Sequence, residues 1–579
     1  MNKMWKSFIA LGLTSCMLIG CGQNVSKEES VVKDDKTNEN TESSSSEVLE
    51  EEGTYPDYLN LDSQRPIIKE GENITLSAVV CTSGDVNAGE DLWFWSFVEQ
   101  VLNIDMEIEV VSAAALEENK SLMLASGDLP DIIYGMGITK SDIVKYGVEE
   151  GMFLPVSDWI SEELTPNLKN VVADFPDEIK ASTAPDGKVY CIPSINTGSV
   201  SSYDKFGVET TFIYTPYLNA IGLEASPTTL DEFVDMMRAF KKLDPGKFGV
   251  DEIYPMLNVG DNFEKYLKTA FGWVNSLDAY TPVWDAAENE VAVPCMQEKY
   301  GDYIRLLNTL YSEGLMHQDY YTMESDTARA YAAEKKVAVW TETPYVAYPD
   351  DFANFVGAAP LTSEWCEVPV SGRGNTFTDG SIFIAADTEY PEVCMRLLDY
   401  INSPEGGMYE SFGPMEGSED LLGMIEGWHL NEAGSWIVYN DLAGYTDEGS
   451  YRLSKVSASG TISDIGPYRQ EYMKEITGGG YSPATEFNMS DPVIHWRKLL
   501  YDVQKDYLVP TLKEAFMSAA QNESYTDLFT VISEYVDSET AKFVVGQRPL
   551  DEIDAFLDEV KAMGGEEYLK LCKELYSNY

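Results

Sequence analysis

Strand-like and helix-like segments alternate between residues 74 and 135, and this alternation restricts the possible folds more than any other feature. Strand patterns and helix patterns follow one another over residues 74–81, 91–102, 106–111, 116–126 and 131–135. Strands separated by helices in this order pair in parallel, with the helices on the faces of the sheet. Because ligands of such sheets bind beyond the carboxyl ends of the strands, we expect functional residues in the loops after Cys81 and Tyr134.

The rest of the chain continues this mixture of strands and helices. Residues 211–215, 336–340 and 381–386 read as strands. Thr229 and Glu232 form the pattern of a capping box in front of an amphipathic helix, and the C-terminal part is largely helical. A chain of 579 residues exceeds what one hydrophobic core normally supports, so we expect more than one packed unit.

The N-terminus has the pattern of a secretory signal. Lys3 and Lys6 precede an apolar run over residues 8–19, which is shorter than a normal transmembrane helix. The run ends in Leu-Ile-Gly-Cys, which resembles the bacterial lipobox and implies that residues 1–21 are a lipoprotein signal and that Cys21 carries the lipid anchor. The alternative is an ordinary signal peptide that is cleaved elsewhere. Residues 22–54 are polar and biased, and we expect a disordered tether.

The charge of the chain excludes some partners. The net charge is −58, and no cluster of Lys and Arg appears, so we expect no nucleic-acid partner and disfavour strongly anionic ligands. The cysteines beyond Cys21 are widely spaced, with no Cys-x-x-Cys, and the three histidines show no ligand spacing. We therefore expect neither a metal site nor a cofactor.

Five short motifs occur in one order along the chain. They are Ala-Ser-Gly-Asp-Leu-Pro-Asp at 125–131, Asp-Gly-Lys-Val-Tyr with a following proline at 186–193, Pro-Thr-Thr-Leu-Asp-Glu-Phe at 227–233, Tyr-Ser-Glu-Gly-Leu at 311–315, and Tyr-Pro-Glu with Leu-Asp-Tyr at 390–400. Together they resemble the extracellular solute-binding proteins of carbohydrate ABC importers (family 1), in particular the large lipoproteins of Gram-positive bacteria. Each motif alone is weak, but their shared order from about residue 70 onward is specific.

The resemblance implies an α/β, two-lobed fold like the type II periplasmic binding proteins, with interlobe hinge strands and a helical C-terminal part. The implied crossings lie near residues 197–215 and 372–386. Lobe 1 would comprise residues 66–210 and 373–420, and lobe 2 would comprise residues 211–372 and 421–579, including a helical C-terminal extension. In this family a ligand closes the cleft between the lobes by hinge motion.

The implied role is that of a monomeric, non-enzymatic receptor. It would be a lipoprotein on the outer face of the bacterial cytoplasmic membrane that captures an oligosaccharide and delivers it to the membrane permease of an ABC importer. The chain has no Gly-x-x-x-x-Gly-Lys-Ser/Thr loop, so we expect a separate ATPase to supply the chemistry of transport.

One departure from the family concerns a calcium loop. Members of the branch often carry Asp-Pro-Asp-x-Asn-Gly-x-x-Asp, whereas residues 244–251 read Asp-Pro-Gly-Lys-Phe-Gly-Val-Asp. The second Asp and the Asn are absent, which leaves too few oxygens for the roughly six to eight ligands that calcium takes. We expect no metal at this stretch.

Aromatic and acidic residues near the strand ends and crossings are the candidate ligand contacts. They are Asp91, Trp93, Trp95, Asn196, Tyr214, Trp340, Glu342, Tyr345, Asp379 and Trp428. Aromatic rings cover the apolar faces of a sugar, while carboxylates and amides bind its hydroxyls. The resemblance places a stacking tryptophan at Trp340. The structural alternatives are packing on a helix face for the first two tryptophans, hinge packing for Asn196 and Tyr214, and a turn for Asp379.

Three other functions remain open at this point. The first is a receptor of the same architecture for a peptide or another solute. The second is an extracellular glycosidase or lyase, because two suitably spaced carboxylates suffice for that chemistry, although no Gly-x-Ser-x-Gly or His-Glu-x-x-His motif occurs. The third is a structural surface protein, which would show no closing motion when a ligand is added.

Overall fold

The computed structural model describes residues 55–577 with the exception of a few internal stretches. These are residues 83–91, 196–206, 258–261, 349, 375–376, 433, 435–436, 446–447, 459–467 and 482–491. The expected signal peptide and tether therefore lie outside the described residues. Tyr55–Tyr579 form one compact unit, and its buried apolar side chains gather mainly in two large cores.

The first core is built on a four-stranded sheet with the order β13-β3-β1-β2. Its strands are β1 (Thr75–Thr82), β2 (Asp105–Ser112), β3 (Ile132–Tyr134) and β13 (Ile382–Ile384). The first three strands are parallel, and α1 (Trp93–Gln100) and α2 (Leu116–Ser126) lie between them in sequence, which confirms the predicted β-α-β-α-β unit. Strand β13 joins the edge from far along the chain and runs antiparallel to β3.

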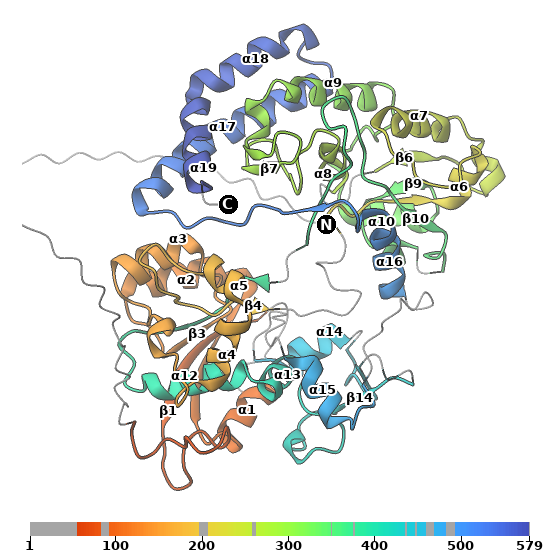
Figure 1. Cartoon of the computed structure of the whole chain (residues 1–579). Helices are drawn as coiled ribbons and strands as arrows, with labels where there is room; N and C mark the ends of the chain where they lie inside the picture. The colour runs from red at the N-terminus through yellow and green to blue at the C-terminus, as the bar shows by residue number, and fades with distance from the viewer. Residues whose placement is uncertain are drawn as a thin grey trace, which may run out of the picture. The chain divides into compact units, whose positions relative to one another are not determined.

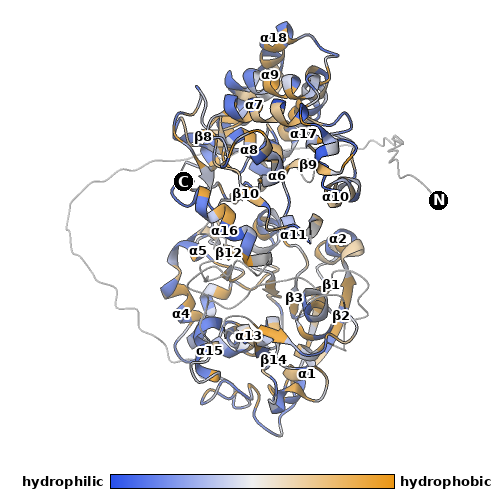
Figure 2. Cartoon of the chain, turned by 90° about the vertical axis from the view of Figure 1, so that its right-hand side faces the viewer, coloured by the Kyte–Doolittle hydropathy of each residue, from blue (hydrophilic) through white to orange (hydrophobic). Residues whose placement is uncertain are grey.

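Apolar side chains cover both faces of this sheet. Leu76, Ala78 and Val80 of β1 pack into one core together with α1 and with α12 (Pro391–Ile401), whereas Val79 and Cys81 pack into a smaller cluster on the other face. The alternation of neighbours along one strand is the period of two that a pleated strand imposes. Figure 2 shows α1 as largely hydrophobic and α15 (Arg469–Ile476) as largely hydrophilic.

The second core surrounds another four-stranded sheet, with the order β10-β5-β9-β6. Its strands are β5 (Phe212–Tyr214), β6 (Tyr254–Met256), β9 (Val337–Trp340) and β10 (Phe355–Gly357). Strand β5 runs antiparallel to both of its neighbours, and β6 runs parallel to β9. Helix α7 (Leu230–Lys241) packs on this core, and Thr229 caps it by accepting the amide of Glu232 at 3.3 Å, which is one half of the predicted capping box.

The C-terminal helices extend the second core (Figure 1). They are α16 (Pro492–Gln504), α17 (Ala519–Val544), α18 (Ile553–Val560) and α19 (Glu566–Leu575). Ile532, Phe556 and Tyr568 are fully buried there against α9 (Lys299–Ser312) and its surroundings. The helical C-terminal part that was expected is therefore present in the described chain.

The expected boundary between the lobes at residue 421 is wrong for one segment. Strands β14 (Trp428–Leu430) and β15 (Ile437–Tyr439) form a hairpin whose buried residues belong to the first core, as does Met473 of α15. A two-stranded hairpin has no core of its own, so it packs on the nearest apolar surface, which the sequence does not reveal. The other lobe boundaries stay predictions.

Two short strand pairs lie on the segments of chain that run between the two cores. Strand β4 (Ser194–Ile195) pairs antiparallel with β12 (Phe377–Thr378), and Ile195 and Phe377 pack in the first core. Strand β12 lies within the second expected crossing, whereas β4 ends just before the first, so the crossings stay predictions. The sequence did not predict the third segment: β16 (Leu508–Val509), between α16 and α17, pairs in parallel with β11 (Ser371–Gly372).

Candidate functional site

A buried hydroxyl, that of Ser381, lies where strands β3 and β13 of the first sheet meet. Strands β1 and β3 end at this edge of the sheet and the antiparallel β13 begins there, so Gly135 donates its amide to the carbonyl of Ser381 at 2.9 Å. Among the described residues, nothing forms a hydrogen bond with the buried Ser381 Oγ. Leaving a buried polar group unpaired costs about 1–3 kcal/mol, so this atom needs a partner, such as a water or a ligand, that the described chain does not supply.

Asp379 lies two residues before Ser381 and forms an ion pair with a buried lysine. Lys140, which begins α3 (Lys140–Asp142), places its Nζ 3.4 Å from Asp379 Oδ1 and donates to the carbonyls of Ala181 and Glu514 at 3.2 and 2.8 Å. The Asp379 side chain is 48% exposed, so its oxygens remain accessible. Burial, with a smaller contribution from the charge of Asp379, raises the pKa of the nearby Glu514 carboxyl.

The edge of the second sheet carries two further buried polar atoms of the same kind. Because β5 runs antiparallel to β9, the start of β5 lies beside the end of β9, with Phe212 opposite Trp340. Thr211 and Trp340 are both fully buried, and neither Thr211 Oγ1 nor Trp340 Nε1 has a hydrogen-bond partner within the described chain. Each of the two sheets therefore has, at the ends of adjacent strands, buried polar atoms that have no hydrogen-bond partner in the described chain.

Glu342 and Tyr345 follow Trp340 directly in the chain. The guanidinium of Arg329 binds the Glu342 carboxylate through two hydrogen bonds of 2.9 and 2.6 Å. The carboxylate is thus oriented and its charge is balanced, which suits it to accept a hydroxyl rather than to attract a cation. Tyr345 lies on α11 (Pro344–Ala347) and is half-buried. The end of β9 thus brings three of the predicted residues together.

Three of the predicted tryptophans are core residues, and their assignment as ligand contacts is wrong. Trp93, Trp95 and Trp428 are at most 2% exposed, and each indole N–H donates at 2.8 Å to a backbone carbonyl, of Asp420, Ala458 and Gly413 respectively. Both tryptophans of helix α1 pack in the first core, as the alternative of packing on a helix face predicts.

Tyr214 is also a packing residue. It is 5% exposed, its ring packs against Tyr217, Tyr348 and Phe355, and its hydroxyl donates to the carboxylate of Asp351. Burial raises the pKa of the Tyr214 hydroxyl, and the bond to Asp351 adds to this effect. Tyr214 is therefore a packing residue of the second core and not a ligand contact.

The remaining predicted residues, Asp91, Asn196 and Cys21, lie outside the described residues. Sequence reasoning in turn missed Thr211 and Ser381. A lone Ser or Thr carries no distinguishing pattern, and only the lack of a partner in the folded chain marks these two residues.

Residues 244–251, at the position of the family's calcium loop, use their acidic side chains in contacts within the chain. Asp244 Oδ1 accepts the amide of Gly246 at 3.1 Å, and Asp251 forms an ion pair with Lys336 at 2.7 Å. In the described chain no group of three or more His, Cys, Asp and Glu residues could hold a metal ion. Every helix within the described ranges is too short or too polar to cross a bilayer.

Comparisons with known proteins identify relatives over most of the chain. The family model described as "Bacterial extracellular solute-binding protein" matches residues 94–412. The fructooligosaccharide ABC transporter substrate-binding protein FusA of Streptococcus pneumoniae is 22% identical over 475 residues, which cover 80% of this chain and 82% of the relative. The polygalacturonan/rhamnogalacturonan-binding protein YtcQ of Bacillus subtilis is 24% identical and covers 83% of this chain and 87% of its own length.

Solved structures are similar over almost their whole length. FusA in complex with kestose has a TM-score of 0.65 at 20% identity and covers 87% of this chain and 99% of its own. A solute-binding protein from Bifidobacterium longum infantis, described as binding HMO, has a TM-score of 0.66 at 16% identity and covers 87% and 98%. At this level of identity the likeness shows the fold alone, and it confirms the predicted two-lobed α/β architecture.

Proposed function

Because the chain belongs to the family of bacterial extracellular solute-binding proteins, we propose that it is the substrate-binding component of an ABC importer for a neutral oligosaccharide. The observation that carries the proposal is the unpaired hydrogen-bonding capacity at the two sheet edges, at Ser381, Thr211 and Trp340. A polyhydroxylated ligand supplies both donors and acceptors to such atoms, and the lobes close on it because it binds the closed state more tightly.

The chemistry around these atoms supports a neutral sugar. The exposed carboxylate of Asp379 and the Arg329-bound carboxylate of Glu342 both accept hydroxyl protons, and each has its charge balanced by a cation. The net charge of −58 disfavours an acidic glycan. Relatives described as binding fructooligosaccharides and HMO support the same class of ligand.

We further propose that Cys21 carries a lipid anchor and that the chain acts as a monomer outside the cell, delivering its ligand to the permease of the importer. The lipobox-like Leu-Ile-Gly-Cys and the polar residues 22–54 support the anchor and its tether. On this proposal the chain binds its ligand and releases it unchanged to the permease, without catalysis.

Calorimetry with a panel of ligands tests the proposal. The panel holds kestose, neutral milk oligosaccharides, an oligogalacturonide and a mixed peptide library, and each bound sugar is recovered and analysed for hydrolysis. We expect saturable binding of a neutral oligosaccharide, an increased melting temperature and intact sugar. Binding of peptides alone, or turnover of the sugar, would contradict it.

Two substitutions locate the site. Ser381→Ala and Thr211→Val each remove one unpaired hydroxyl, so we expect affinity to fall about fivefold per hydroxyl while the melting temperature does not fall. Ser418→Ala is the matched control, because Ser418 Oγ accepts the amide of Asp420 near the first core and belongs to neither sheet edge. An unchanged affinity in both site variants would place the ligand elsewhere.

A further inference from the structure

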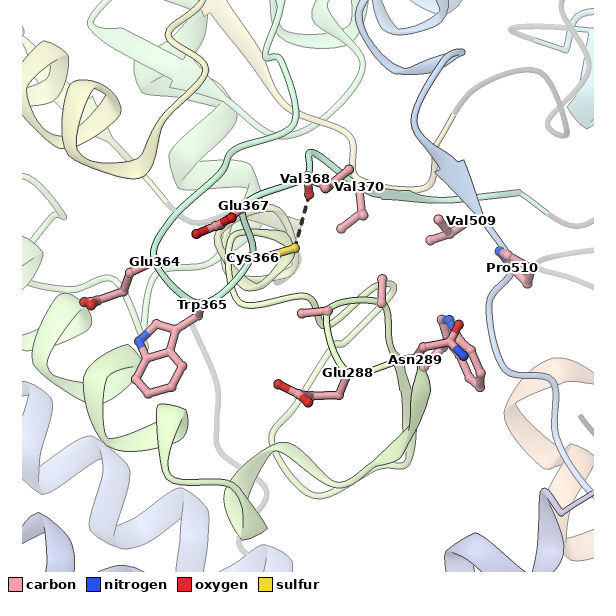
Figure 3. Close-up of a pocket in the computed structure, with 13 residues that line it drawn as sticks. Glu288, Asn289, Glu364, Trp365, Cys366, Glu367, Val368, Val370, Val509 and Pro510 are labelled. Atoms are coloured by element: carbon pink, nitrogen blue, oxygen red, sulfur yellow. Dashed lines mark hydrogen bonds between the residues drawn. The ribbon is translucent and has the colours of Figure 1, made fainter.

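A cavity lies on the part of the chain that surrounds the second core. It has a volume of about 730 Å³, within the range of ligand pockets. Figure 3 shows residues 364–368 and Val370 along one wall, Glu288 and Asn289 opposite, and Val509 and Pro510 at one end. The opposite wall is the hairpin of β7 (Val283–Asp285) and β8 (Glu290–Ala292). None of the lining residues belongs to either sheet edge described above.

A buried ion pair fixes the hairpin wall. Asp285 is fully buried and lies 2.7 Å from Lys299 Nζ. Its other oxygen accepts the amides of Ala287 and Glu288 at 3.1 and 3.2 Å. The same lysine donates to the carbonyl of Phe271 at 2.6 Å. The turn that carries Glu288 and Asn289 is therefore held in one conformation before any ligand arrives.

Local hydrogen bonds fix the other wall. Ser363 Oγ donates to the carbonyl of Ala270 at 2.5 Å and accepts the amide of Trp365 at 3.0 Å. Cys366 Sγ donates to the carbonyl of Val368 at 3.2 Å, the contact drawn in Figure 3. The loop is thus attached to the second core at its base, and it presents Trp365 to the cavity.

The lining combines aromatic faces with hydrogen-bond acceptors. Trp284 and Trp365 are half-buried, while Glu288, Asn289, Glu364 and Glu367 are exposed. None of the 13 described residues that line the cavity is basic, so an anionic ligand has no counter-charge there. The volume is larger than a small ammonium ion fills. Flat rings beside carboxylates and an amide suit the apolar faces and the hydroxyls of sugar rings.

We propose that this cavity is a second carbohydrate-binding site, which takes a neutral saccharide of two or three rings independently of the ligand bound at the sheet edges. Trp365 stacks on one ring, and Glu288 and Asn289 bind hydroxyls from the opposite wall. The exposed Val368, at 66%, extends the apolar surface at the rim.

Calorimetry and saturation-transfer NMR with the whole chain test the proposal, using maltotriose, kestose, cellotriose and tetramethylammonium as probes. We expect one of the neutral trisaccharides to bind at a site that Trp365→Ala weakens about tenfold or more. Asn289→Gly removes the amide and tolerates the left-handed backbone of this exposed position (φ 56°), so it should weaken the same site without lowering the melting temperature. Ser381→Ala should leave the affinity of the cavity unchanged. A failure of this proposal is therefore distinguishable from a failure of the proposed site at the sheet edges.

Each other outcome overturns the proposal. Absence of any binding that depends on Trp365 or Asn289 removes the site. Binding of tetramethylammonium in place of the saccharides, with the same dependence on Trp365, assigns the cavity to organic cations instead. Circular dichroism and melting of Trp365→Ala show whether the loop still folds, and Asn289→Gly decides the question if it does not.

Discussion

The carboxylate of Glu209 accepts a hydrogen bond from the hydroxyl of Ser371 at 2.5 Å, and this contact joins two segments that connect the cores. Glu209 is 1% exposed and also accepts the amides of Gly372 at 3.0 Å and Asn275 at 3.1 Å. Burial raises the pKa of the Glu209 carboxyl, and the hydrogen bonds offset part of that rise. One buried carboxylate thus organises the backbone on both sides of the connection.

The third connecting segment is joined to the same place. Gln504 donates from Nε2 to the carbonyl of Glu209 and accepts the amide of Gly207 at its Oε1, both at 2.9 Å. A Cβ atom at Gly207 would lie 1.8 Å from Ser371 Oγ, so only glycine fits this close approach. The three segments therefore behave as one bonded unit around Glu209.

We expect Glu209→Ala to destabilise the protein by about 3 kcal/mol. The change leaves the hydroxyl of Ser371 and the amides of Gly372 and Asn275 without an acceptor in a buried place. Urea unfolding followed by circular dichroism measures the difference. Glu224→Ala, at an exposed glutamate, is the control and should change the free energy of unfolding by less than about 0.5 kcal/mol. Equal effects of the two substitutions would contradict the role of Glu209.

The effect of Glu209 on stability should also depend on pH. The folded chain raises the pKa of this carboxyl above its ordinary value of 4.5, so it holds the proton to a higher pH than the unfolded chain does. Its contribution is therefore fully present below pH 4.5 and is lost as the pH rises through the folded pKa. Glu209→Gln does not titrate, so the stability of the wild type relative to this variant should decrease over that interval in parallel urea titrations. If the relative stability of the wild type increased instead, the folded chain would lower the pKa of Glu209, which contradicts the prediction.

The parallel arrangement of β1, β2 and β3 could be predicted because hydrophobic periodicity is a local property of the sequence. The strand β16 could not, because it spans only Leu508–Val509 and pairs with β11 more than a hundred residues earlier. The core that receives the hairpin around Trp428 cannot be predicted for a related reason. The sequence of the hairpin shows that it needs an apolar surface, but not which of the two cores provides it.

The candidate site was predictable only in part. Trp340 ends a strand pattern, and its position at the sheet edge follows from that fact. Trp93 and Trp95 also follow a strand pattern, but an aromatic residue on a helix near a strand end has the same pattern whether it faces a ligand or a core. Residue type and spacing do not reveal which atoms lack partners, so Ser381 and Thr211 emerged only in the folded chain.

Trp93 should affect stability and leave ligand binding unchanged. Its ring packs against Phe97 and Tyr409 in the first core, and its indole N–H donates to the carbonyl of Asp420. Trp93→Ala therefore leaves a large cavity, and we expect a loss of about 3–5 kcal/mol in the free energy of unfolding. Calorimetry at a temperature where the variant stays folded should give the affinity of the wild type. If the variant bound the ligand more weakly but kept the stability of the wild type, Trp93 would be a ligand contact after all.

Trp340 should show the opposite behaviour. Its ring packs on Tyr348 with ring centroids 6.1 Å apart, and Phe keeps most of this packing while it removes an Nε1–H that has no partner in the described chain. Because no hydrogen bond is broken in the free protein, we expect Trp340→Phe to lower the stability by no more than about 1.5 kcal/mol, the cost of a small change in buried volume.

The affinity of this variant for the oligosaccharide decides the role of the indole. If the ligand accepts the Trp340 N–H, the variant loses one buried hydrogen bond in the complex, which corresponds to about a fivefold weaker binding. Trp273→Phe is the control, because Trp273 is also fully buried in the second core and belongs to no strand of this sheet. A similar loss of affinity in both variants would mean that general loosening of the core, and not a bond to the ligand, explains the effect at Trp340.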